Sequence, residues 1–194
     1  MAKLYFKYGA MGSSKTAQAL ITKFNYEERG MKVWLIKPQI DTRDEQSVCR
    51  SRIGLEAPAE LIPAEASLYE LYQQRAHEGD NVIIVDESQF LTESQVDELG
   101  DIVLDFDIPV MCFGLKTDFL THMFPGSKRL LEIAESVSEI KTICSCGRKA
   151  TVNARIDQNG NVITEGEQIF IGGNESYIAM CFKCYKEKCK AQRS

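Results

Sequence analysis

A short loop near the N-terminus places the strongest constraint on what this chain can fold into. The loop reads Gly-Ala-Met-Gly-Ser-Ser-Lys-Thr, and it follows an apolar run at residues 3–8 and precedes a helical pattern at residues 16–28. In a strand–loop–helix unit of this length, backbone N–H groups form an anion-binding nest, a lysine reaches the terminal phosphates and a hydroxyl binds Mg²⁺. The sequence therefore predicts a phosphate site made by Gly9, Ala10, Met11, Gly12, Ser13, Ser14, Lys15 and Thr16.

One position of this loop departs from the strict phosphate-loop pattern. Ser14 occupies the place before the lysine where a glycine is usual. At this position Ser14 must adopt a backbone conformation that glycine normally supplies. Gly12, two residues earlier, relieves part of the steric crowding in the loop. Taken alone, a degenerate match of this kind can also be an ordinary loop, but its place between a strand and a helix favours the phosphate site.

Apolar runs alternate with helical patterns over the first 140 residues. Further strands are predicted at residues 32–36, 82–85 and 109–113, and helices at residues 67–78 and 92–106. Thr92 and Gln95 form a capping-box pattern at the start of the helix at residues 92–106. Continuous apolar strands between helices indicate an α/β fold, in which a P-loop NTPase-like parallel sheet is covered on both faces and binds ligands at the carboxyl ends of its strands.

Two acidic residues, Asp86 and Glu87, directly follow the apolar run at residues 82–85. Phosphoryl transfer needs a positioned Mg²⁺ and an oriented or deprotonated acceptor hydroxyl. We assign Asp86 to the metal through a water molecule and Glu87 to the acceptor hydroxyl as its base. The alternative is a solvated pair of charges at a helix start. Phe90, close by, either walls the acceptor pocket or fills the core.

Four of the seven cysteines form two close pairs, and the metal ligands predicted from them are Cys144, Cys146, Cys181 and Cys184. Four thiolates suit a closed, structural Zn²⁺ site. The first pair is one residue shorter than usual, so free thiols, or a site in which Cys189 replaces one ligand, are the alternatives. Around this site, short alternating strands and an Asn159-Gly160 turn signal predict a small second domain at residues 141–194, after a first domain at residues 1–140.

Composition excludes several classes of partner. The net charge is -5 and the basic residues are dispersed, so we expect no nucleic acid and no membrane surface as partner. The apolar run at the N-terminus is too short for a signal peptide, and no later stretch approaches the roughly 18 apolar residues of a membrane span. We expect a cytoplasmic protein.

Taken together, these motifs resemble the thymidine kinases of the cytosolic type, which join a P-loop domain to a zinc-bearing lasso domain. The resemblance covers nearly the whole chain. It is carried by the phosphate loop, both cysteine pairs and residues 40–43, 86–90, 114–119 and 171–177.

The resemblance implies ATP-dependent phosphorylation of the 5′-hydroxyl of thymidine, and of deoxyuridine, with Mg²⁺, a structural Zn²⁺, a homotetramer and feedback inhibition by dTTP. Glu87 matches the catalytic base, and the nucleotide-binding segment after the strand comprises Asp86, Glu87, Ser88 and Gln89. Asp41 and Arg43 match a pair near the phosphates and metal. The walls around the base match Met11, Phe90, Leu115, Phe119 and Phe124. The lasso would hold the pyrimidine through backbone groups and close with Tyr177; its matching residues are Ile171, Gly172, Gly173 and Tyr177.

The chief rival is a nucleic-acid-stimulated ATPase with a zinc ribbon, because an Asp-Glu pair after an apolar strand occurs in such proteins too. A two-lobed motor needs a second nucleotide-binding domain and a nucleic-acid binder needs a basic stripe, and the sequence has neither. A second alternative, a regulator that only senses nucleotide, does not need a base such as Glu87.

Overall fold

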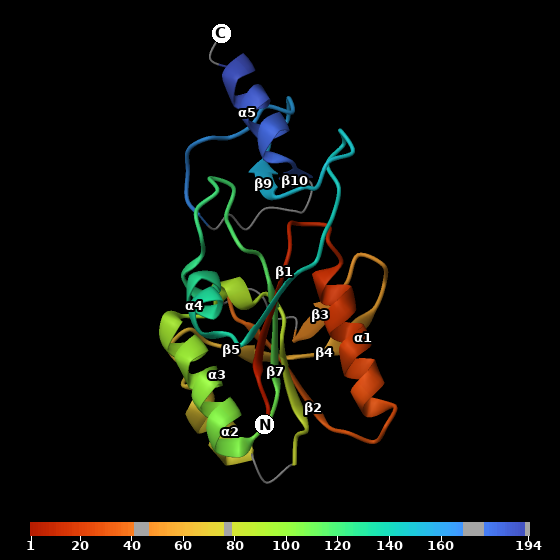
Figure 1. Cartoon of the computed structure of the whole chain (residues 1–194), viewed down its shortest axis with the longest axis vertical. Coiled ribbons are helices and arrows are strands. Elements are labelled where there is room, and N and C mark those ends of the chain that lie inside the picture. Colours follow the sequence, from red (N-terminus) through yellow and green to blue (C-terminus); the bar gives the residue numbers. More distant parts are fainter. Residues whose placement is uncertain (41–46, 76–78, 169–176, 193–194) are drawn as a thin grey trace.

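The computed structural model describes residues 1–40, 47–75, 79–168 and 177–192 (Figure 1). Its main feature is a six-stranded sheet in the order β5-β2-β6-β7-β1-β8. The strands are β1 (Leu4–Tyr8), β2 (Val33–Pro38), β5 (Glu60–Ile62), β6 (Val82–Val85), β7 (Val110–Gly114) and β8 (Ser136–Glu139). All neighbouring strands in it run parallel, which confirms the predicted α/β fold with a parallel sheet.

Helices cover both faces of this sheet, as Figure 1 shows. Helix α1 (Lys15–Glu27) packs on one face, and the opposite face carries α2 (Leu68–Arg75), α3 (Glu93–Phe106) and α4 (Pro125–Ile133). Successive residues of a strand point to opposite faces, so β6 contributes to both cores. Val82 and Ile84 pack with Leu20 of α1, whereas Ile83 and Val85 pack in the cluster on the α2–α3–α4 side. A strand buried on both faces must be apolar throughout, and β6 is.

Helix α3 begins where its capping box predicts. Thr92 Oγ1 accepts a hydrogen bond from the Gln95 backbone N–H at 3.1 Å, and Gln95 Oε1 accepts one from the Thr92 backbone N–H at 3.2 Å. Two N–H groups that the first helical turn leaves unpaired are thereby satisfied. The helix ends at Phe106, as predicted, because Asp107 adopts a left-handed conformation with φ 52°.

Several short elements have no counterpart in the predicted set. The structure adds an antiparallel hairpin of β3 (Val48–Arg50) and β4 (Glu56–Pro58), the edge strands β5 and β8, the 3₁₀ turn η2 (Ser88–Phe90) and helix α4. Strands of three or four residues with charged or proline positions are too short to show a period of two. Helix α4 opens with Pro-Gly, which on sequence alone indicates a turn.

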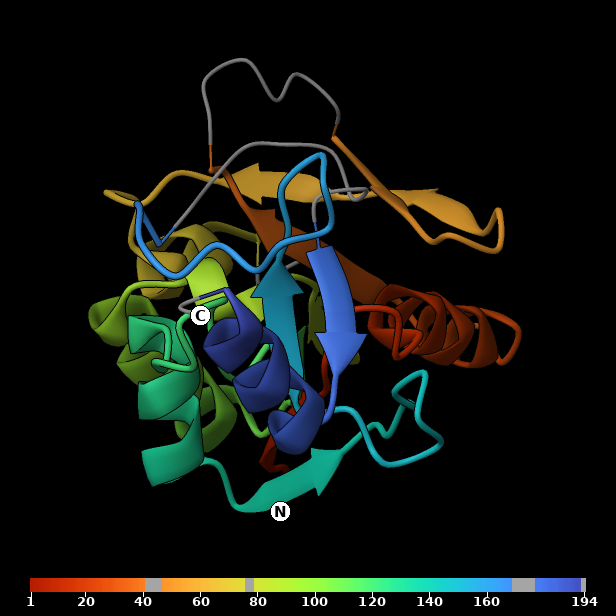
Figure 2. The same ribbon diagram turned by 90° about the horizontal axis from the view of Figure 1, so that it is seen from above.

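The C-terminal part of the chain lies over the carboxyl edge of the sheet, as the view from above shows (Figure 2). It contains β9 (Val152–Arg155) paired antiparallel with β10 (Tyr177–Met180), and helix α5 (Phe182–Ala191), around a core of its own. The turn predicted at Asn159-Gly160 is present, since Ile156 and Val162 form a β-bridge across it. Among the described helices, none combines the length and apolar character of a membrane span.

One buried side chain ties this C-terminal part to the sheet edge. Asn153 of β9 is 3% exposed, and its Oδ1 accepts a hydrogen bond from the backbone N–H of Met11 at 2.7 Å. Its Nδ2 donates to the carbonyl oxygen of Thr117 at 3.0 Å. A single amide therefore holds the loop after β1 and the loop after β7 against β9.

Candidate active site

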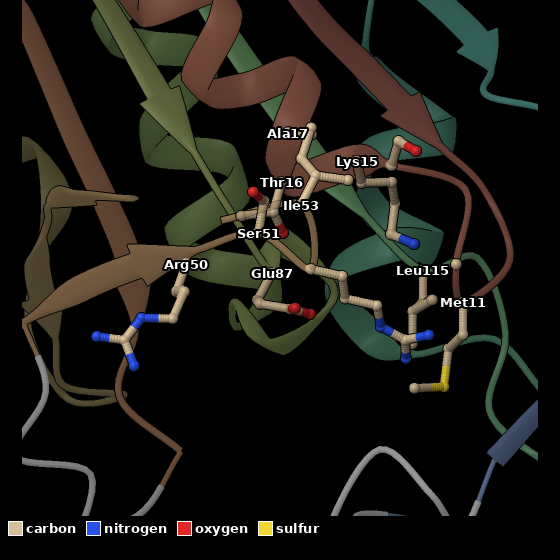
Figure 3. A pocket seen from close by; sticks show the side chains of 12 residues that line it. Met11, Lys15, Thr16, Ala17, Arg50, Ser51, Ile53, Glu87 and Leu115 are labelled. Carbon is tan, nitrogen blue, oxygen red and sulfur yellow. The ribbon is translucent and has the colours of Figure 1, made fainter. Parts of the chain in front are cut away.

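A cavity of about 340 Å³ opens at the carboxyl ends of β1 and β6 (Figure 3). Its wall is formed by part of the phosphate loop (residues 9–16) and the start of α1, by Glu87 after β6, by Leu115 after β7 and by residues 50–53 of the β3–β4 hairpin. Sequence positions as far apart as Met11 and Leu115 thus face one space. Of the predicted site residues, Met11, Gly12, Ser14, Lys15, Thr16, Glu87 and Leu115 line it.

The phosphate loop has the backbone that an anion site needs. Gly12 and Ser14 both have positive φ angles, of 72° and 64°, and Ser14 is the N-cap of α1 without a side-chain capping bond. The first N–H groups of α1 are therefore left to an anion at the positive end of the helix dipole. Gly9 is also required, because a β-carbon there would overlap the Ile140 carbonyl oxygen.

The left-handed backbone of Ser14 leads to a prediction. A residue with a β-carbon loses roughly 1 kcal/mol in this conformation, whereas glycine adopts it freely. We expect Ser14→Gly to retain full activity and to unfold at an equal or higher temperature. The gain in the free energy of unfolding should be at most about 1 kcal/mol. Ser14→Ala, which keeps the β-carbon, should show no such gain. An inactive Ser14→Gly with an active Ser14→Ala would contradict this account of the loop.

Lys15 is the first residue of α1, and Asp86 directly follows β6. The Lys15 Nζ donates to the Ala10 carbonyl oxygen at 2.9 Å, and burial lowers the pKa of this amine, while Glu87 and Asp86 act in the opposite direction. The Thr16 hydroxyl donates to Asp86 Oδ1 at 3.3 Å. Burial, followed by repulsion from Glu87, raises the pKa of Asp86 to about 7.

The oxygens of Thr16 and Asp86 fit a hard divalent cation. Mg²⁺ binds proteins through one or two carboxylates together with phosphate oxygens and waters. Asp86 is 4% exposed and stands beside a second acid, so a cation there would favour its charged form. These two side chains are the ones that would hold Mg²⁺ at the edge of this cavity, which Thr16 lines.

Glu87 sits at a strained turn with its side chain in the cavity (Figure 3). Its φ of 52° is left-handed, a conformation that costs a non-glycine residue energy and that gathers at functional sites. Its Oε2 accepts a hydrogen bond of 2.5 Å from Gln89 Nε2, and Gln89 Oε1 accepts one of 2.9 Å from the Leu115 backbone N–H. The buried Gln89 thus fixes Glu87 to the end of β7.

Several other predicted site residues do not line this cavity. Phe90 and Phe124 form an edge-to-face pair with ring centroids 5.4 Å apart. Phe119 is 1% exposed and packs beneath Arg155, whose guanidinium carbon is 3.8 Å from the ring centroid. The buried Ser88 Oγ has no hydrogen-bond partner within the described part of the chain.

Tyr177, the predicted end of the lasso, is the first described residue after residues 169–176. Its hydroxyl accepts a hydrogen bond of 2.9 Å from Arg155 Nε. On the other side of that segment, Gln168 Nε2 donates to Asp118 Oδ2 at 2.9 Å. The two flanks of the segment are thereby fastened to the rest of the fold. The predicted site residues Asp41, Arg43, Ile171, Gly172 and Gly173 lie outside the described residues.

Two arginine sites escaped the reasoning from sequence. Arg50 and Arg52 line the cavity from the hairpin tip, and Arg155 packs between the rings of Phe119 and Tyr177. The available signal for the first site was two cations close to Gly54, a pattern that is also typical of an ordinary exposed turn. For Arg155 there was no local signal, because its partners are far away in the sequence.

The four predicted metal ligands do come together. The Sγ atoms of Cys144, Cys146, Cys181 and Cys184 all lie within 4.8 Å of one another, and those of Cys146 and Cys181 are 3.6 Å apart. Zinc–sulfur bonds of about 2.3 Å in a tetrahedron separate the sulfurs by roughly 3.8 Å, so the set fits Zn²⁺. The backbone N–H groups of Cys146 and Cys181 lower the pKa of Cys144 to about 6. Cys189 is not part of the cluster.

This geometry predicts about one Zn²⁺ per chain by elemental analysis of protein purified without added zinc. The Cys184→Ser variant should lose the metal and unfold at a lower temperature, because the C-terminal core is too small to be stable without the bound metal. Cys189→Ser is the matched control, since Cys189 lies on the same helix α5 outside the cluster, and it should keep the metal. A folded and active chain without metal would contradict a structural zinc.

Comparison with known proteins agrees with this site. The family model described as thymidine kinase matches residues 2–185. The chain is 49% identical over 189 residues to a thymidine kinase of Zymomonas mobilis subsp. mobilis, which covers 97% of this chain and 98% of that protein. It is 48% identical over 188 residues to a thymidine kinase of Legionella pneumophila, covering 96% and 90%, and 45% identical over 192 residues to one of Yersinia pestis, covering 98% of each. This chain therefore belongs to the thymidine kinase family.

Proposed function

We propose that this chain transfers the terminal phosphate of ATP to the 5′-hydroxyl of thymidine, and also of deoxyuridine, in pyrimidine deoxynucleotide salvage. The observation that carries the proposal is one shared cavity. It joins the lysine of a phosphate loop to a carboxylate, Glu87, in a chain of the thymidine kinase family. A phosphate-binding lysine and a carboxylate base are the groups that phosphoryl transfer to a hydroxyl requires.

The residues divide the work by chemistry. Backbone N–H groups of the phosphate loop and the Lys15 amine bind the phosphates at the start of α1. Glu87 accepts the proton of the acceptor hydroxyl as that oxygen attacks the phosphorus. Thr16 and Asp86 would hold Mg²⁺, which would supply positive charge to neutralise the phosphates during transfer.

The acceptor nucleoside is proposed to lie beside Met11 and Leu115, on the side of the cavity toward the C-terminal part. By the family resemblance, the aromatic pair of Phe90 and Phe124, together with Phe119, would wall the base. The backbone of residues 171–173 and the Tyr177 side chain would hold the pyrimidine, while Asp41 and Arg43 would act near the phosphates. These roles rest on the family resemblance and stay predictions.

Further properties are proposed on the same footing. We propose a kinase domain at residues 1–140 and a zinc-bearing lasso domain at residues 141–194, with each structural Zn²⁺ held by the four clustered cysteines. A homotetramer, a cytoplasmic location, inhibition by dTTP and no nucleic-acid partner complete the proposal.

A coupled ATP assay over a panel of nucleosides tests the proposed function. Thymidine and deoxyuridine should be turned over, and deoxycytidine and the purine deoxynucleosides should not. Added dTTP should inhibit the reaction. A parallel arm measures ATP hydrolysis with single- and double-stranded DNA; stimulation by DNA, with no turnover of thymidine, would establish the rival ATPase instead.

A further inference from the structure

An arginine at the tip of the β3–β4 hairpin faces the phosphate loop. Arg52 lines the same cavity as Lys15 and Glu87. One of its terminal nitrogens, Nη1, lies 3.8 Å from the point where a β-carbon on Gly12 would be, so the guanidinium is next to the middle of the loop. It is also close enough to Lys15 for the two positive charges to repel each other. Two cations therefore converge on one space.

In the described part of the chain, Arg52 forms no hydrogen bond or ion pair with another residue. Arg50, two residues earlier on the same hairpin, differs in this respect. Its Nε donates to Glu56 Oε2 at 2.9 Å across the hairpin, so its charge is balanced by a neighbour. Among the described residues, one arginine of the hairpin is thus paired, and the other, beside the phosphate loop, has no ion-pair partner.

The hairpin holds Arg52 at a defined place. The Ser51 backbone N–H donates to the Leu55 carbonyl oxygen at 2.8 Å, and the Leu55 N–H donates to Ser51 Oγ at 2.9 Å. Gly54, with φ 86°, makes the turn between them. At its base, Cys49 is 2% exposed and packs with Leu20 of α1. The cation is therefore carried by a hydrogen-bonded turn that is anchored to the helix of the phosphate loop.

We propose that Arg52 binds the terminal phosphate of ATP in this cavity, opposite Lys15. A guanidinium stays charged at all relevant pH values and matches two phosphate oxygens with parallel N–H groups. During transfer the acceptor oxygen forms its bond to the γ-phosphorus, the bond from that phosphorus to the β,γ-bridging oxygen breaks, and the acceptor proton passes to Glu87. Arg52 donates to the γ-phosphate oxygens throughout, and so stabilises the charge spread over them. This inference rests on the proposed function and adds a residue to it.

The test measures the affinities of ATP and ADP, with Mg²⁺, for the wild-type protein and three variants. Arg52→Gln should weaken ATP binding by roughly 10- to 100-fold and ADP binding by clearly less, because only ATP carries the terminal phosphate. Arg52→Lys should recover part of the loss, since it restores the charge without the planar fork. Arg29→Gln is the matched control, because Arg29 is exposed beyond the C-terminal end of α1 and does not line the cavity, and it should leave both affinities within about twofold.

Two outcomes would overturn the role of Arg52: equal ATP affinity in Arg52→Gln and wild type, or an equal loss for ATP and ADP. A failure of the proposed function looks different. In that case the wild-type protein would bind ATP and not phosphorylate thymidine, while the comparison of ATP with ADP still tests Arg52. Because Arg52 is exposed, its variants should unfold at the wild-type temperature, and this measurement accompanies each titration.

Discussion

Replacing Glu87 with glutamine is expected to lower kcat for thymidine phosphorylation by roughly a hundredfold or more, with ATP affinity nearly unchanged. The amide has almost the shape of the carboxylate, but it cannot take the proton of the acceptor hydroxyl. Its oxygen can still accept the hydrogen bond from Gln89 Nε2, so the side chain should keep its place. Steady-state kinetics, together with an ATP titration of the same preparation, checks both parts of this result.

The control for this variant is the same chemical change away from the cavity. Glu93 lies in the first turn of α3 and is exposed, so Glu93→Gln should have the wild-type rate. If Glu87→Gln also turned over thymidine at the wild-type rate, Glu87 would not be the base. The strained backbone at this residue would then need another explanation.

Replacing Lys15 with methionine is expected to reduce turnover by about a thousandfold or more, because a fixed charge aimed at the transferring phosphate is lost. The fold should tolerate the change. Burial already lowers the pKa of Lys15, which means that the protein holds this charge at a cost, and methionine has a similar length without it. The measurement is the initial rate at saturating ATP and thymidine, with thermal unfolding of both proteins.

Lys23→Met provides the matched control for this second variant. Lys23 also lies on α1, but its amine pairs with Glu27 and it does not line the cavity, so the rate should not change. If Lys15→Met kept more than about a tenth of the wild-type rate, the lysine would not be the group that binds the terminal phosphates. A variant that unfolded at a much lower temperature would instead contradict the account of a costly buried charge.

Much of the fold could be predicted from the sequence because its central elements carry strong local signals. Strand β6 is apolar at all four positions, and α3 has a complete capping box at Thr92 and Gln95. The edge of the sheet could not be predicted in this way. Strand β8 reads Ser-Val-Ser-Glu, and its place beside β1 is set by pairing with a distant segment rather than by its own pattern.

The same distinction applies to the candidate site. Asp86 and Glu87 directly follow one strand, and Lys15 and Thr16 end the loop that follows another. The carboxyl ends of parallel strands meet at one edge, so the proximity of these residues could be predicted. Arg52 reaches the cavity only because β3 and β4 pair and pack on α1. Arg155 owes its place to Phe119 and Tyr177, which are 36 and 22 residues away by their numbering. Such contacts are created by the tertiary fold.

The most direct test of the central claim supplies the purified protein with Mg²⁺, γ-labelled ATP and one of three acceptors: thymidine, 3′-deoxythymidine or 5′-deoxythymidine. Our account predicts that label appears on thymidine and on 3′-deoxythymidine, one for each ADP formed. It predicts none on 5′-deoxythymidine, which lacks the accepting hydroxyl. Label on 5′-deoxythymidine, or ADP formed without labelled nucleoside, would contradict transfer to the 5′-hydroxyl.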